Sequence, residues 1–77
     1  MPHVVISCFK IEVDYEKLDI IQNEISKVLH NELGCDMGAI SIDLKMIEPN
    51  NWKNGVYMSS IKPRMEYLIK KPEYTYK

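Results

Sequence analysis

The feature that most constrains the fold is one long amphipathic pattern in the N-terminal half of the chain. Apolar residues recur there at helical spacing, at Leu18, Ile21, Ile25, Val28, Leu29 and Leu33. Asp14 stands where an N-cap belongs, and Glu16 places a negative charge in the first turn, where it suits the helix dipole. Gly34 follows at the position that commonly ends a helix. The pattern predicts a helix of about five turns.

Two strand patterns flank this helix. The segment HVVISCF, residues 3–9, is rich in β-branched residues. The segment AISIDLKM, residues 39–46, alternates apolar and polar side chains. Strand, helix and strand in this order predict a βαβ unit with parallel strands and a right-handed crossover. Because one helix covers only one face of so small a sheet, we expect the protein to assemble as an oligomer.

The second half of the chain has a looser pattern. Pro-Asn-Asn at residues 49–51 predicts a turn, and a helical pattern then returns over residues 56–71. Pro63 is expected to break or kink that helix, or to begin a fresh one. The tail EYTYK, residues 73–77, either adds an edge strand or docks on a neighbour. The expected fold class is α+β: a single domain, residues 1–77, with one βαβ unit and a broken C-terminal helix.

Composition and charge narrow the function. The net charge is -1, and no basic cluster exceeds pairs such as Lys70-Lys71, which argues against a nucleic-acid partner. No apolar run approaches the roughly 20 residues of a membrane span, and no signal-peptide pattern opens the chain. Cys8 and Cys35 match neither metal-ligand nor CxxC spacing, so we expect two reduced thiols. These features predict a small cytoplasmic protein without a membrane partner.

Few conventional catalytic groups are present. The sequence has no Ser-His-Asp arrangement, no glycine-rich phosphate loop and no carboxylate–histidine cluster with metal spacing, so no metal is expected. His30 is expected to be a solvated helix residue, and His3 a structural residue beside Pro2. Asp43 and Lys45, on the polar face of the second strand, are expected to be solvated or to pair at an interface.

Pro2, directly behind Met1, is the remaining candidate. Proline is tolerated at the first residue of a strand, which is an ordinary structural reason for its presence. If Met1 is removed, however, Pro2 becomes a secondary amine that takes up and releases a proton. In an apolar pocket built by Phe9, Met46 or Trp52, desolvation would lower the pKa of that amine and provide a neutral base. The residues alone leave both interpretations open.

These segments together resemble a known family. Pro2 opening a strand in a chain of this length, followed by one βαβ unit, is similar to the tautomerase superfamily of 4-oxalocrotonate tautomerase. The segments ISIDLKMIEPNNW and IKPRMEYLIKKPEY resemble the second half of its longer members, so the similarity covers essentially the whole chain. The resemblance implies the MIF-like tautomerase fold and a homodimer, with the hexamer of the shorter members as the second possibility.

The resemblance also implies an isomerase that works as a proton shuttle. The amine of Pro2 would act as general base on the enol hydroxyl of a 2-hydroxydienoate or enolpyruvate and then return a proton to carbon. No metal or organic cofactor is used. The tryptophan that shapes the family's pocket matches Trp52. The implied catalytic residue is therefore Pro2. The expected substrate-binding residues are Trp52 by this match, Phe9 and Met46 by their apolar character, and Lys10 and Ser41 by their polar groups.

Two departures from the family pattern bear on the substrate. Members that act on diacids carry arginines at the positions of Glu12 and Ser41, and neither residue here binds a carboxylate bidentately. We therefore expect a monocarboxylate such as phenylenolpyruvate, held by backbone amides, by Ser41 or by one of Lys10, Lys45 and Arg64.

Two alternatives remain open. The first is related proline-based chemistry on the same scaffold, such as dehalogenation or decarboxylation, for which Glu12 is the one evident acid partner. The second is a non-enzymatic dimeric module of the same fold.

Overall fold

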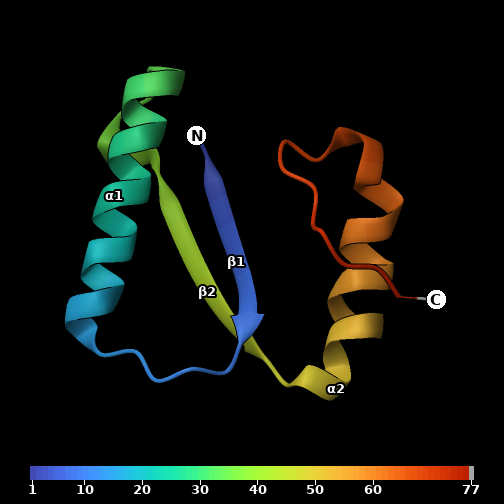
Figure 1. The fold of residues 1–77 in the computed structure, drawn as a ribbon. Helices are drawn as coiled ribbons and strands as arrows, with labels where there is room; N and C mark the ends of the chain where they lie inside the picture. The colour runs from blue at the N-terminus through green and yellow to red at the C-terminus, as the bar shows by residue number, and fades with distance from the viewer. Residues whose placement is uncertain (77) are drawn as a thin grey trace. The chain divides into compact units, whose positions relative to one another are not determined.

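The computed structural model describes residues 1–76 and divides into two compact units, Met1–Met46 and Ile47–Lys77. The first unit contains strand β1 (His3–Phe9), helix α1 (Tyr15–Leu33), the short 3₁₀ helix η1 (Met37–Ala39) and strand β2 (Ser41–Ile47), whose last residue lies in the second unit. The two strands pair in parallel, and α1 lies along one face of their sheet (Figure 1). The predicted βαβ unit is confirmed.

Helix α1 begins and ends where its capping residues require. The carboxylate of Asp14 accepts a hydrogen bond from the backbone N–H of Lys17 at 2.9 Å, which is the N-cap interaction. Gly34 has φ 70°, and its N–H donates to the carbonyl of His30 at 3.0 Å. His30 is exposed, as expected, but its Nδ1 lies 2.6 Å from the carbonyl oxygen of Cys35 and so closes the turn after the helix.

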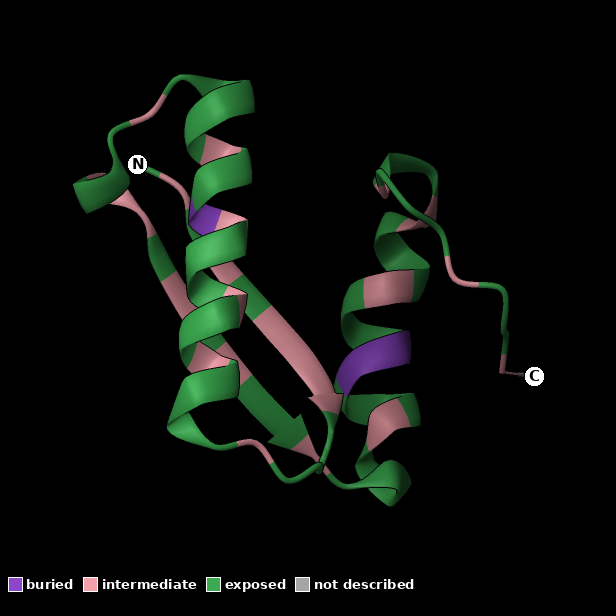
Figure 2. Cartoon of the chain, turned by 60° about the vertical axis from the view of Figure 1, so that its left-hand side comes forward, coloured by how far each residue is buried: buried purple, intermediate pink, exposed green. Residues whose placement is uncertain are grey.

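The side chains of each strand alternate between the two faces of the sheet. The even-numbered residues Val4, Ile6, Cys8, Ile42 and Leu44 are half-buried (Figure 2), as expected for the face along α1. The odd-numbered face consists of His3, Val5, Ser7 and Phe9 on β1 and of Ser41, Asp43, Lys45 and Ile47 on β2. Most of its side chains are exposed, including Val5 and Phe9.

Strand β2 is displaced from its predicted position. It begins at Ser41 instead of residue 39 and continues to Ile47. The N–H of Ala39 donates to the carbonyl of Asp36 at 3.0 Å and that of Ile40 to the carbonyl of Met37 at 3.3 Å. These bonds close a 3₁₀ turn around Gly38, so the apolar alternation begins before the strand does.

The second unit is helical from its start. Helix α2 (Pro49–Trp52) leads into a π-helix, η2 (Lys53–Ile61), and then into a 3₁₀ helix, η3 (Lys62–Tyr67). The predicted turn at residues 49–51 is wrong, because proline's fixed φ also suits the first turn of a helix and Pro49 occupies that position. The predicted break at Pro63 is confirmed, since this proline lies in the first turn of η3.

The C-terminal tail packs on the π-helix. No edge strand forms in residues 72–76, contrary to one of the two expectations. Instead the rings of Tyr74 and Tyr76 lie with centroids 5.7 Å and 5.0 Å from that of Tyr57, whose side chain is only 3% exposed. The hydroxyls of Tyr57 and Thr75 are 3.1 Å apart. Aromatic packing therefore organises this unit.

Candidate active site

Pro2 and Ser41 lie together at one end of the sheet. Pro2 is half-buried and immediately precedes β1, and its carbonyl accepts a hydrogen bond from the backbone N–H of Ser41 at 3.1 Å. They meet because parallel strands begin at the same edge of a sheet. The structure thus brings together two of the residues predicted for the site. Met1 precedes Pro2 and is fully exposed, so the nitrogen of Pro2 is an amide here.

His3 joins this end of the sheet through its side chain. Its Nδ1 lies 2.6 Å from the hydroxyl oxygen of Ser41, and both residues are exposed on the odd-numbered face. The sequence predicts a structural role for His3 and gives no sign of this contact. No local pattern indicates this pair, since the two residues are 38 positions apart; only the register of the strands shows it.

Phe9, Lys10 and Met46 lie at the opposite end of the sheet. Seven strand residues separate the two ends of β1, and at about 3.3 Å per residue the separation is roughly 20 Å. Within one chain these three residues therefore do not join Pro2 and Ser41.

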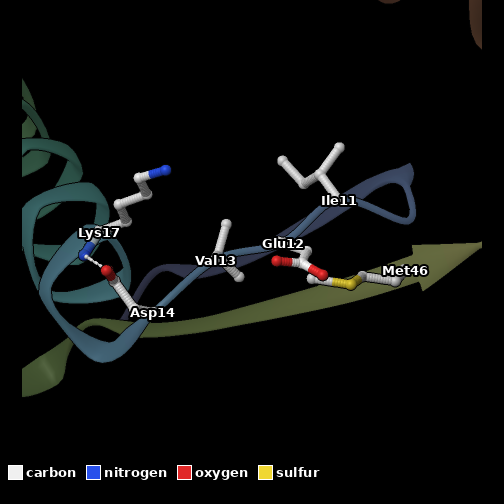
Figure 3. Close-up of a pocket in the computed structure, with 6 residues that line it drawn as sticks. All are labelled: Ile11, Glu12, Val13, Asp14, Lys17 and Met46. Carbon is white, nitrogen blue, oxygen red and sulfur yellow. Dashed lines mark hydrogen bonds between the residues drawn. The ribbon is translucent and has the colours of Figure 1, made fainter.

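A shallow hollow of about 390 Å³ lies near that far end (Figure 3). It is lined by the segment between β1 and α1, together with Lys17 and Met46. Two carboxylates, those of Glu12 and Asp14, and the ammonium group of Lys17 contribute its charges. The carboxylate of Asp14 is engaged as the N-cap of α1, which leaves Glu12 as the acid that the hollow offers.

Trp52 belongs to the second unit, at the end of α2. It is half-buried, and its indole N–H donates to the hydroxyl of Tyr74 at 2.8 Å. Among the proposed carboxylate-binding cations, Arg64 lies over the ring of Tyr67, 4.8 Å from its centroid, while Lys45 is exposed on the odd-numbered face. The pocket role predicted for Trp52 remains a prediction.

The remaining reactive groups form no further site. Cys8 and Cys35 are free thiols, and the Cys35 thiol points to the carbonyl of Leu29 at 3.5 Å. Within residues 1–76 no group of three or more His, Cys, Asp or Glu side chains is placed to hold a metal ion. Over the same residues, none of the helices combines the length and the apolar character that a membrane crossing requires.

Comparison with known proteins identifies the class. No protein-family model matches the chain, but bacterial tautomerases match it at 37–40% identity over 75 residues, which cover 97% of this chain and 99% of each relative. The chain therefore belongs to the tautomerase superfamily, in the group of 4-oxalocrotonate tautomerase.

The relatives include Tautomerase PptA of Escherichia coli O127:H6 and of Shigella sonnei, each 37% identical, and that of Klebsiella pneumoniae strain 342, at 40%. The resemblance inferred from the sequence is confirmed, and these names support a tautomerase, hence an isomerase, function.

Proposed function

We propose that this protein is a cofactor-independent tautomerase that converts the enol form of enolpyruvate-like monocarboxylates, such as phenylenolpyruvate, into the keto form. Its base would be the amine of Pro2, uncovered by removal of Met1. The observation that carries the proposal is the position of Pro2 in a chain of this superfamily. It stands half-buried at the start of β1, with its carbonyl bound to the N–H of Ser41.

The proposed reaction needs only one group, which first accepts a proton and then donates it. The nitrogen of Pro2 takes the proton of the enol hydroxyl at C2, and the O–H electron pair forms the carbonyl. The electrons of the C2–C3 double bond then form a C–H bond at C3 with the proton carried by the pyrrolidinium of Pro2. This transfer regenerates the neutral amine. Partial burial of Pro2 would favour this chemistry once Met1 is removed, because desolvation disfavours the charged form of an amine. Full exposure of Met1 leaves it accessible to an aminopeptidase.

A monocarboxylate is favoured over a diacid by the side chains available. Ser41, beside Pro2, offers one hydroxyl, which would hold one carboxylate oxygen. Glu12 lines the hollow at the far end of the sheet and would reach this site only from a second copy, where it would repel a second carboxylate. An apolar or aromatic group at the distal end of the substrate would avoid that repulsion and would meet the apolar side chains Ile11, Val13 and Met46 of the same hollow in the second copy.

We further propose that the active form is a homodimer. Phe9, Lys10 and Met46 lie roughly 20 Å from Pro2 within one chain, so they would contribute to a site around Pro2 only from a second copy. Exposed large apolar side chains also favour association: Phe9 is 47%, Ile20 55%, Val28 57% and Leu33 66% exposed. Sedimentation equilibrium at micromolar concentration should give the mass of two chains, and a folded monomer there would overturn this assembly.

The test of the activity is ketonisation of phenylenolpyruvate by wild type, Pro2→Ala and the control Pro72→Ala, which alters another half-buried proline. Pro2→Ala replaces the ring-held secondary amine by a primary one, and the loss of this positioned base should lower kcat/KM by about 10² to 10⁴, while Pro72→Ala stays near wild type. Intact-mass measurement should show that the active protein lacks Met1. Activity in Pro2→Ala, or in a chain that keeps Met1, would contradict the proline mechanism.

The pH profile supplies a second test of the same base. For wild type, kcat/KM should rise with pH as the ammonium of Pro2 loses its proton, because only the neutral amine accepts the enol proton. The midpoint should lie below the range of an exposed proline amine, since burial lowers the pKa. A profile that is flat across this range would remove Pro2 from the proton transfer.

A further inference from the structure

The hydrogen bond between His3 and Ser41 involves two side chains that remain accessible. Both are exposed on the odd-numbered face, and their atoms Nδ1 and Oγ are 2.6 Å apart. The backbone N–H of Ser41 is already committed to the carbonyl of Pro2 at 3.1 Å. Ser41 is therefore held at its backbone by Pro2 and at its side chain by His3.

The direction of this hydrogen bond decides what the hydroxyl can bind. If Nδ1 of His3 accepts the hydrogen bond, the hydroxyl of Ser41 donates its proton to His3 and can only accept a hydrogen bond from a ligand. If Nδ1–H donates, the Ser41 proton is free and can be given to an anion. The second arrangement is a chain from Nδ1–H to Oγ–H to a carboxylate oxygen, in which each bond polarises the next.

We propose that His3 is a positioning residue that orients the hydroxyl of Ser41 as a donor to the substrate carboxylate. This inference rests on the proposed function, because it is the reaction at Pro2 that places a carboxylate here. In an enolpyruvate the carboxylate carbon is bonded to the enol carbon, so a substrate whose enol hydroxyl meets the nitrogen of Pro2 has its carboxylate near the start of β1, where Ser41 also lies. Ser41 is the first residue of β2.

The experiment measures binding as well as turnover. Calorimetric titration with 3-phenylpropanoate, a carboxylate without an enol, reports the carboxylate site whether or not Pro2 is the base. Ser41→Ala should weaken its Kd by about ten- to hundredfold, because a hydrogen bond to a charged group is lost. His3→Leu should weaken it by about three- to tenfold, and His3→Asn, whose amide nitrogen can occupy the Nδ1 position, should restore most of the loss.

Turnover then separates positioning from other roles. The His3→Leu effect on phenylenolpyruvate should fall mainly on KM, and the rising limb of kcat/KM against pH should not move. In the double variant with Ser41→Ala, loss of His3 should have no further effect, because His3 acts through that hydroxyl. If His3→Leu does not fold, His3→Gln replaces it, since its longer amide matches Nε2 and not Nδ1.

Three results would overturn the inference. If His3→Leu lowers the Tm but leaves the Kd for 3-phenylpropanoate unchanged, the contact between His3 and Ser41 only stabilises the pairing of the two strands. Additive losses in the double variant would show that His3 does not act through Ser41. A shifted pH limb in His3→Leu would show that His3 acts on the amine directly. Full activity of Pro2→Ala, by contrast, would refute the proposed function. The Kd values for 3-phenylpropanoate would still show whether His3 acts on carboxylate binding through Ser41.

Discussion

The two units of the chain are built on different principles. In the first unit, local signals set the elements: Asp14 caps α1 at its start, Gly34 ends it, and β1 occupies the predicted residues 3–9. In the second unit the backbone passes from α2 through the π-helix η2 to the 3₁₀ helix η3, and the buried ring of Tyr57 is surrounded by tyrosines from the tail. Capping and periodicity mark the elements of the first unit in the sequence, whereas the packing of the tail's tyrosines on Tyr57 organises the second.

The largest effect that we expect from this difference is that of Tyr57→Ala. The ring is 3% exposed and packs against Tyr74 and Tyr76, so its removal should cost about 3–5 kcal/mol of stability. Tyr57→Phe, which loses only the hydroxyl contact with Thr75, should cost about 1 kcal/mol. Hydrogen exchange should show the greatest loss of protection in residues 53–61. Equal loss throughout α1 would contradict the contrast between the units.

In the first unit the matching test is Gly34→Ala, which should destabilise by about 1 kcal/mol. Gly34 has φ 70°, and a Cβ there would meet nothing within 4 Å, so the cost is one of backbone conformation and not of a clash. Gly38→Ala is the control, because its surroundings are equally open and its φ is not left-handed. Chemical denaturation of the pair should show a loss for Gly34→Ala alone. Equal losses would mean that α1 does not depend on this left-handed cap.

Gly55 tests the second unit with the same substitution and the opposite expected sign. It lies within η2, its φ is not left-handed, and a Cβ would meet nothing within 4 Å. Alanine there should stabilise the protein by about 0.5–1 kcal/mol, since it reduces the freedom of the unfolded chain and favours helix. A destabilised Gly55→Ala would indicate that the wide π-helical turn requires glycine.

The same contrast explains how far the sequence could predict the fold. The caps of α1 act within a few residues, so they are visible in the sequence. At Pro49 the local signal was ambiguous, because Pro-Asn-Asn suits a turn as well as the first turn of a helix, and only the structure decided. The π-helix was not predicted from the sequence. In the structure the hydroxyl of Ser59 donates to the carbonyl of Gly55 at 2.8 Å. In an α-helix this carbonyl would accept from the backbone N–H of Ser59, so the side chain competes with the backbone for it.

The candidate site divides in the same way. Pro2 could be singled out by its place in the sequence, and Ser41 only through the family resemblance, which sets it at a position that bears on the substrate. The contact between His3 and Ser41 depends on the register of the two strands, which alternation alone does not set. Phe9, Lys10 and Met46 were grouped with Pro2 by their chemical character, yet strand length separates them within one chain.

The smallest effect should come from Tyr74→Phe, which removes only the acceptor for the indole N–H of Trp52. Tyr74 is 45% exposed, so water can replace the lost partner, and the cost should be about 0.5 kcal/mol. Trp52 is the sole tryptophan of the chain, so its fluorescence reports the change directly. We expect a shift of its emission in Tyr74→Phe and none in Tyr15→Phe, a tyrosine that is 91% exposed. Unchanged emission in both variants would show that the hydroxyl of Tyr74 does not hold Trp52 in solution, and the aromatic cluster would then depend on ring packing alone.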